Sequence, residues 1–448
     1  ELLRIYDIQA EKQVMTPQST FMIVAAVREA KLEQLRSLLQ TMNRSIGEAD
    51  PDNNLVPFGK FDRLHVARFV ILEAHTASDI TEYGLTPYPW RPSVAFFGDC
   101  DGESDSLLAQ LADLAGAGLI NIFSHCEDFA ENEIDLLAWM KAHQLQPAAN
   151  YINWIGRTVS QVHEEAALHR ILSHSLQEIT ADCGRKNCRD LRQKLLSHVE
   201  MEKHAGRLSL TPPVATPCGW KIRNLLHKFS IPLMLLLATP LLLLAAPFLA
   251  LRLRMLERTD PEINIRPEQQ HVRRLSRTED RYATNQFNVF GDVKPGLFRL
   301  LTLKFLLLLL DYSARHVYKR GFLTRVRSIH FARWVLMDNN RRIFFASNYD
   351  GSLESYMDDF INKVGWGLNL VFSNGVGYPS TRWLIKGGAQ HEEKFKNTLR
   401  RHQLASEVWY KAYPDITAYE LSRNSRIRQG VENRQSSDAE IREWLSLI

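Results

Sequence analysis

A histidine and an arginine three residues apart occur twice in this chain, inside two copies of one pattern. Leu64–Val70 has the sequence LHVARFV, and Ile329–Val335 has the sequence IHFARWV. Such β-branched and aromatic runs predict buried strands, where an imidazole or a guanidinium must find hydrogen-bond partners. We expect either a ligand site or a structural polar network at the paired positions, which are His65 and His330, and Arg68 and Arg333.

An Asp-Gly pair opens a second repeated block after each copy of the pattern. Asp101–Ser124 aligns with Asp350–Ser373 without a gap. Aspartate is favoured as a helix N-cap and glycine permits a tight turn, so one expectation is a structural turn between a strand and a helix. The alternative is that the carboxylate transfers protons.

The first repeat lies in a module that we place at residues 15–130. Its apolar runs and turn residues predict the order β-α-β-β-α-β, with the last strand at Leu119–Ser124. This order is the split arrangement called ferredoxin-like, in which the helices cover one face of an antiparallel sheet.

The second repeat lies in a module at residues 326–430, with its last strand expected at 367–373. Trp383–Ile385 followed by 390–402 resembles the opening strand and helix of the first module. We therefore predict that the second module is circularly permuted relative to the first.

Each predicted sheet has helices on one face only, and two such sheets bury their open faces by stacking about 10 Å apart. We expect the two modules to stack with each other as an α+β barrel. The arrangement resembles the dimeric α+β barrel superfamily, whose members include dye-decolourising peroxidases and chlorite dismutases. The resemblance covers about half the chain and rests on topology and repeat.

Gly98–Gly102 has the sequence GDCDG and is similar to the Gly-x-x-Asp-Gly pattern of dye-decolourising peroxidases. This resemblance implies that Asp101 is the distal residue that moves a proton between peroxide oxygens. It also implies that Arg68 or Arg333 stabilises the developing negative charge. The second copy departs from the pattern, because Ser347 replaces the first glycine.

The same resemblance implies a haem cofactor, with His330 and His65 as the cofactor-binding candidates. His391 and His402 are the other histidines available as an axial ligand, and His330 is preferred for its expected interior position. No equivalent of the family's proximal-histidine segment is found.

A long apolar segment separates the two modules. Ile231–Leu251 has 21 residues without a charge, enough for a hydrocarbon core of roughly 30 Å, but basic residues flank both ends. Modules that pack together must lie on one side of a membrane. We therefore predict a monotopic anchor, bent at Pro240, with residues 298–310 as a second helix in the interface. The alternative is a single span between modules that never meet.

The remaining segments carry little sign of chemistry. We expect a helical insert at 131–205, a linker at 206–325 that holds both apolar segments, and a helical tail at 431–448. Cys183 and Cys188 lack the usual zinc-binding spacing, so we predict no metal.

Composition limits the possible functions. With 45% apolar and 24% charged residues the chain is not disordered, and a net charge of +4 gives no reason to expect nucleic acid. Five scattered cysteines favour a reducing compartment, hence the cytoplasmic face of a membrane. Membrane lipids and an apolar small-molecule substrate are the expected partners.

Two functions follow from these patterns. The first is a membrane-surface oxidoreductase, haem peroxidase-like, acting on an apolar or lipid-derived substrate. The second is a non-enzymatic lipid-binding or membrane scaffold protein with the same two-module barrel.

Overall fold

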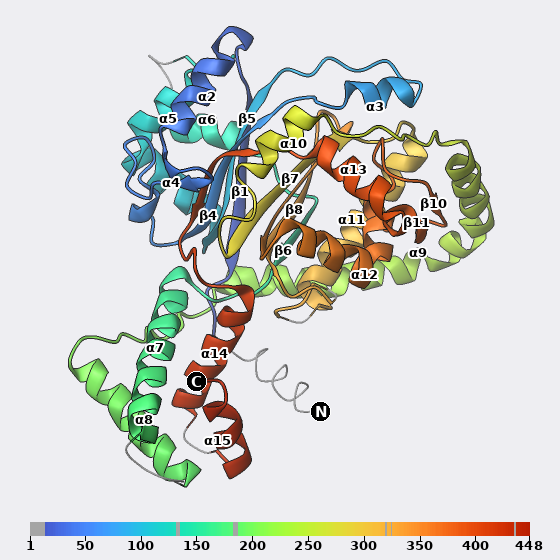
Figure 1. The fold of residues 1–448 in the computed structure, drawn as a ribbon. Helices are drawn as coiled ribbons and strands as arrows, with labels where there is room; N and C mark the ends of the chain where they lie inside the picture. The colour runs from blue at the N-terminus through green and yellow to red at the C-terminus, as the bar shows by residue number, and fades with distance from the viewer. Residues whose placement is uncertain (1–13, 131–134, 182–186, 319, 324, 434–435) are drawn as a thin grey trace.

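The computed structural model describes residues 14–130, 135–181, 187–318, 320–323, 325–433 and 436–448. Two four-stranded antiparallel sheets lie among helices, which confirms the predicted α+β class (Figure 1). The first sheet has the order β1 (Gln18–Ala26), β5 (Ser93–Asp101), β4 (Leu64–Leu72) and β12 (Ser406–Lys411). The second has the order β6 (Ala149–Ile152), β8 (Ile329–Met337), β9 (Arg342–Asp350) and β7 (Thr284–Asp292).

Helices cover the outer face of each sheet and form a separate core with it. Over the first sheet lie α2 (Leu32–Gln40), α4 (Ser104–Leu114), α5 (Gly116–Phe123) and α6 (Leu136–Ala142). Over the second lie α11 (Leu297–His316), α12 (Leu353–Phe372) and α13 (Glu392–His402). Smaller elements are α3 (Ala77–Glu82), α10 (Gln269–Ser276) and the hairpins β2–β3 (Asn43–Ser45, Glu48–Ala49) and β10–β11 (Thr381–Arg382, Lys386–Gly387).

The two halves of the chain repeat one order of elements. β1 pairs with β5 over nine residue pairs, and β7 pairs with β9 in the same way over nine. The first strand of the second half is therefore Thr284–Asp292, and the predicted circular permutation is wrong. Polar residues such as Asn285 and Asn288 interrupt the apolar pattern that predicts a strand, although the whole of β7 is buried.

The strands expected at Leu119–Ser124 and 367–373 are helices, α5 and the second part of α12. A short apolar run does not distinguish a buried helix from a buried strand. The break between the two helical parts recurs as well, with non-helical backbone at Ala115 and at Val364.

The last strand of each half crosses to the sheet of the other half. After α6 the chain bridges β1 at Gln144 and then forms β6 at the edge of the second sheet. After α13 it bridges β7 at Gln403 and then forms β12 at the edge of the first sheet. The segment expected to be a helical insert thus contributes a strand, and neither sheet closes into a barrel.

The inner faces of the two sheets share one apolar cluster. Met22, Val70 and Phe97 of the first sheet pack there with Val335 and Phe344 of the second. Because the edge strands are exchanged and the inner faces are packed, the two halves form one folded body.

Four helices form a stalk beyond one end of the sheets (Figure 1). They are α7 (Val159–Ala181), α8 (Cys188–His204), α14 (Ala418–Glu432) and α15 (Asp438–Leu445). α7 follows β6 and α14 follows β12, so each exchanged strand leads directly into the stalk.

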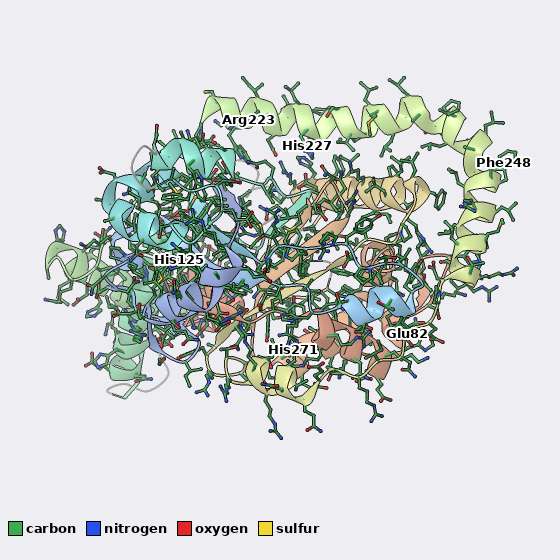
Figure 2. All side chains as sticks on the ribbon, turned by 90° about the horizontal axis from the view of Figure 1, so that it is seen from above. Glu82, His125, Arg223, His227, Phe248 and His271 are labelled. Atoms are coloured by element: carbon green, nitrogen blue, oxygen red, sulfur yellow. The ribbon has the colours of Figure 1, made fainter. Side chains whose placement is uncertain are left out.

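The apolar segment lies in α9 (Cys218–Thr259), which has 42 residues. In the described part of the chain it is the one single helix that is long and apolar enough to cross a membrane. The pair α4 and α5 passes the same test only jointly, although it is bent by 93° and contributes to a buried core. Figure 2 shows α9 running beside the body and turning at Phe248. The prediction placed the bend at Pro240, whereas the sharp bend lies next to Pro247.

Candidate functional site

A β-bulge in each central strand sets the direction of the repeated histidine. The pairing of β4 with β5 shifts between Leu64 and Val66, which makes His65 the extra residue. The pairing of β8 with β9 shifts at the equivalent place, between Ile329 and Ala332. Strict alternation would put the histidine and the arginine on opposite faces. The bulge instead turns both toward the other half of the molecule.

His65 is fully enclosed, with 1% of its surface exposed, and both of its ring nitrogens have partners. Nε2 lies 2.9 Å from Oδ1 of Asp101, and Nδ1 lies 2.8 Å from the hydroxyl of Tyr413. The second oxygen of Asp101 accepts a hydrogen bond of 2.9 Å from the backbone N–H of Val159, the first residue of α7. Burial raises the pKa of the Tyr413 phenol well above its usual range.

His330 repeats this arrangement in the second half. Its Nε2 lies 2.6 Å from Oδ1 of Asp350. The second oxygen of Asp350 accepts a hydrogen bond of 2.7 Å from the backbone N–H of Ala418, the first residue of α14. A carboxylate in this position satisfies a free N–H group and opposes the positive end of the helix dipole.

The two Asp-Gly turns thus have the predicted glycine conformation but a different capping partner. Gly102 and Gly351 have φ values of +76° and +82°, which an L side chain rarely adopts. Asp101 and Asp350 cap stalk helices that begin far away in sequence, and not the helices that directly follow them. These contacts, which sequence alone could not reveal, fasten the stalk to the sheets.

Arg333 lies between the sheets and reaches the first sheet from the second. It donates to the backbone oxygens of Phe21, at 3.0 Å, and Gly98, at 3.2 Å, and forms an ion pair with Asp99. Burial lowers the pKa of Arg333 and raises that of Asp99. The carboxylate that pairs with Arg333 is therefore that of Asp99, whereas the resemblance implied Asp101, two residues later.

Arg68 makes the reciprocal contact with the second sheet. It donates to Oδ1 of Asn288 at 2.8 Å, to the backbone oxygen of Ser347 at 3.1 Å, and to the side-chain oxygen of Asn348. Asn348 occupies the position that Asp99 has in the other half. Burial, with a smaller contribution from Arg333, lowers the pKa of Arg68 to about 9. Attraction to Asp99 opposes this shift, but the hydrogen-bond acceptors of Arg68 are carbonyl and amide oxygens, and the ion pair of Asp99 is with Arg333.

The space between the two histidine–aspartate pairs is small. A cavity of about 10 Å³ is lined by His65, His330, Asn153, Trp154 and Tyr413, among others. That volume holds about one water molecule, whereas small-molecule sites occupy about 300–1,000 Å³.

The surroundings of the two histidine–aspartate pairs do not fit a haem, because the cavity that they line has room for about one water molecule. Nε2 of His330, the preferred axial ligand, lies 2.6 Å from the carboxylate of Asp350. Neither ring nitrogen of His65 is free to bind iron, and Asp101 uses both oxygens within the protein. Of the other candidates, His402 is buried with Nδ1 2.9 Å from the backbone oxygen of Thr398, and His391 is exposed beside α13.

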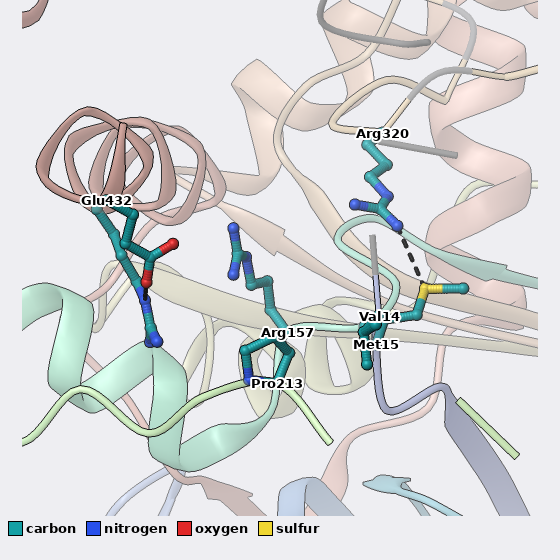
Figure 3. A pocket seen from close by; sticks show the side chains of 8 residues that line it. Val14, Met15, Arg157, Pro213, Arg320 and Glu432 are labelled. Atoms are coloured by element: carbon teal, nitrogen blue, oxygen red, sulfur yellow. Dashed lines mark hydrogen bonds and ion pairs between the residues drawn. The ribbon is translucent and has the colours of Figure 1, made fainter. Parts of the chain in front are cut away.

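Two further cavities differ in size and in lining. One of about 20 Å³ at the base of the stalk is lined by Arg157, Arg320 and Arg428 (Figure 3). Another of about 440 Å³, within the size range of small-molecule sites, lies along β12. Its lining is mixed, with aromatic rings such as Phe61 and Trp409 and charged side chains that include Asp62 and Lys411. Burial lowers the pKa of Lys411 to about 8.

The paired histidines, aspartates and arginines form a buried polar network that joins both halves and the stalk. Comparison of the chain with protein-family models, with curated proteins and with solved structures gave no match.

Proposed function

We propose that this chain is a monotopic membrane protein that binds lipid without a redox cofactor. In this proposal the two-sheet body rests on one leaflet, held there by α9 and by the outward face of α11. One observation carries the proposal. Both ends of α9 are fastened to the same folded body, while the apolar side chains between those ends are exposed.

Polar contacts fasten the N-terminal part of α9. Arg223 forms an ion pair of 2.7 Å with Glu103 of the first half. Nδ1 of His227 lies 2.9 Å from Nε2 of His316, and Nε2 of His227 lies 3.5 Å from the carboxylate of Asp311. The last two residues belong to α11, so this end of α9 contacts both halves of the body.

A buried carboxylate fastens the C-terminal end. Glu257 accepts hydrogen bonds from the hydroxyl of Thr381 at 3.1 Å and from the backbone N–H groups of Trp383 and Leu384 at 2.9 and 2.8 Å. Just beyond the helix, Asp260 forms an ion pair of 2.8 Å with Lys294.

Between these ends, α9 carries no charged residue from Phe229 to Leu251. The large apolar side chains that α9 exposes are Ile222, Leu225, Leu226, Phe229, Leu233, Met234, Leu236, Leu237, Leu241, Leu242, Leu243, Leu244, Phe248, Leu249, Leu251 and Met255. A helix that is hydrophobic on every side is stable when an apolar medium surrounds it. A membrane span needs its ends on opposite sides of a hydrocarbon core of about 30 Å. Ends held by one body favour a segment that enters one leaflet and returns.

α11 adds a second apolar surface. Its inward face buries Arg299, Leu303 and Leu307, and its opposite face exposes Leu297, Leu301 and Phe305. These three residues and the exposed apolar residues of α9 are called the apolar belt below. An exposed apolar patch of this kind is typical of a membrane or protein contact.

Flotation with lipid vesicles tests the proposal. We expect the full chain to float with vesicles, and we expect the double variant Leu236→Asp, Leu237→Asp to stay in the dense fraction while keeping its circular dichroism spectrum. The double variant Ile46→Asp, Leu114→Asp is the matched control, because Ile46 is 55% exposed, Leu114 is 48% exposed, and both lie outside the belt. The proposal fails if the wild-type chain does not float.

A haem peroxidase-like activity is the second function, and the filled space around His330 does not favour it. We expect the purified protein to be colourless and to gain no Soret band when haem is added. A Soret band that is lost in His330→Ala would restore the peroxidase proposal.

A further inference from the structure

The hairpin β10–β11 presents two large apolar side chains at its tip, Trp383–Ile385. Trp383 is 44% exposed and Ile385 is 48% exposed, while Leu384 between them is buried. Trp383 and Leu384 have φ values of +59° and +54°. Residues other than glycine rarely adopt this left-handed conformation, which persists only where the surroundings enforce it.

Two elements enforce the shape of this tip. Glu257 of α9 accepts the backbone N–H groups of Trp383 and Leu384, as described above. Asn369 of α12 donates from Nδ2 to the backbone oxygens of Ile385, at 2.7 Å, and Gly387, at 2.9 Å. The tip is therefore built by the same carboxylate that fastens the end of α9.

The surroundings of the tip have the composition of a membrane interface. The guanidinium of Arg254, on α9, lies 5.2 Å from the ring centroid of Trp383. Arg382 and Lys386 are exposed on either side of the tip. Tryptophan is enriched at the level of lipid headgroups, and basic side chains near the surface attract anionic lipids.

The helix that holds the tip carries another exposed tryptophan. Trp366 is 48% exposed on α12, three residues before Asn369, which holds the tip. The equivalent position of the first half carries Ala117, which is also exposed. Because the repeated helix tolerates a small side chain there, packing does not require the tryptophan.

We propose that Trp383–Ile385, together with Trp366, is a second membrane contact that inserts at the headgroup level of an anionic leaflet. This inference rests on the proposed function, since α9 must first bring the body to the bilayer. The occupant is lipid because the tip is continuous with α9 through Glu257 and Arg254, and because its basic neighbours match anionic headgroups. Two separate contacts fix how the body is oriented on the surface.

An environment-sensitive fluorophore at the tip tests this inference. The label is attached to Ile385→Cys in the full chain, with Cys183, Cys188 and Cys218 replaced by serine. Ile46→Cys is the matched control, since Ile46 is an isoleucine with 55% exposure in the β2–β3 turn. Vesicles of phosphatidylcholine with phosphatidylglycerol are compared with phosphatidylcholine alone.

We expect the label at 385 to shift to the blue and to gain about twofold or more in emission on the anionic vesicles, and less on neutral ones. Nitroxide lipids labelled near the headgroup should quench it, and the label at 46 should not change. If the labelled chain floats while positions 385 and 46 behave alike, the inference is overturned and the proposed function stands. If the wild-type chain does not float, the proposed function itself has failed.

Glu257→Ala, made in the Ile385→Cys chain, tests the link between the tip and α9. Loss of the acceptor should remove the fluorescence change at 385 while flotation by the apolar belt persists. An unchanged signal at 385 would contradict the claim that Glu257 shapes the tip. Thermal unfolding, monitored by circular dichroism, verifies that this variant is folded.

Discussion

The helix between the first and second strands of each half has a similar inner face and a different outer face in the two halves. α2 buries Leu35 and Leu39, and α11 buries Leu303 and Leu307. Outward, α2 exposes Glu33, Gln34, Ser37 and Gln40, whereas α11 exposes Leu297, Leu301 and Phe305. Since the same sheet architecture is built with either helix, the fold does not require an apolar outer face. The difference supports the proposal that the outer face of α11 contacts a membrane.

The buried arginines differ between the halves in a similar way. Arg333 has a carboxylate, Asp99, and Arg68 has the amide of Asn348 at the equivalent place. Removing one partner of a buried ion pair leaves an uncompensated charge, so Asp99→Asn should lower the free energy of unfolding by about 3–5 kcal/mol. Asn348→Asp supplies a missing carboxylate and should cost much less. Urea unfolding of both variants measures this, and equal losses would remove the claimed asymmetry.

Substitutions can make the apolar outer face of α11 as polar as the outer face of α2. Changing Leu297, Leu301 and Phe305 to glutamate should weaken vesicle binding by at least about 100-fold. Burial of one apolar side chain contributes about 1.5–3 kcal/mol, so the loss of three exceeds the roughly 2.7 kcal/mol that a 100-fold change requires. The matched triple variant Gln34→Glu, Ser37→Glu, Gln40→Glu should bind as wild type. Co-sedimentation with vesicles gives both affinities. A similar loss in both variants would mean that added charge, and not the apolar belt, sets the binding.

The second turns of α7 and α14 differ in a buried residue, Glu165 in one and Asn424 in the other. Burial, opposed by Arg157 and Arg428, raises the pKa of Glu165 to about 7. The folded state then keeps a proton that the unfolded chain loses near pH 4.5. Stability should therefore fall by about 2–3 kcal/mol as the pH rises from about 4.5 to about 7. In Glu165→Gln this part of the pH dependence should disappear from urea unfolding, and a persisting slope would assign it elsewhere.

The histidine–aspartate pairs are the feature that the two halves share most closely, so their variants should behave alike. Asp101→Asn and Asp350→Asn each weaken a helix cap and a contact with histidine, at about 1–2 kcal/mol. Hydrogen exchange should increase in the first turn of α7 in one variant and of α14 in the other. Unequal responses would show that only one pair fastens the stalk.

Much of the fold was predictable because it is local or repeated. The α+β class, the strands around the two histidine patterns, and the apolar segment follow from residue periodicity. The exchange of β6 and β12 between the sheets was not predictable, since no local pattern determines which sheet a strand joins. β7 was missed because its polar residues are buried against Arg68, a contact made across the molecule.

The residues that form the site were easier to predict than the groups that they contact. The repeat identified both histidines, both arginines and both Asp-Gly turns as equivalent. The bulge at His65 cancels the expected alternation, and Tyr413 and Val159 come from segments far along the chain. Asp101 was expected to act beside an arginine, but it contacts His65 and the first residue of α7 instead.

The sidedness of the two ends of α9 tests the monotopic proposal most directly. Cys218, exposed at the first residue, and Thr259→Cys, at the last, are labelled one at a time with a membrane-impermeant maleimide. The other accessible cysteines are changed to serine, and the protein is inserted in sealed vesicles. We predict that both positions react from the same side of the bilayer. Reaction of the two positions from opposite sides would establish a single span and contradict the proposal.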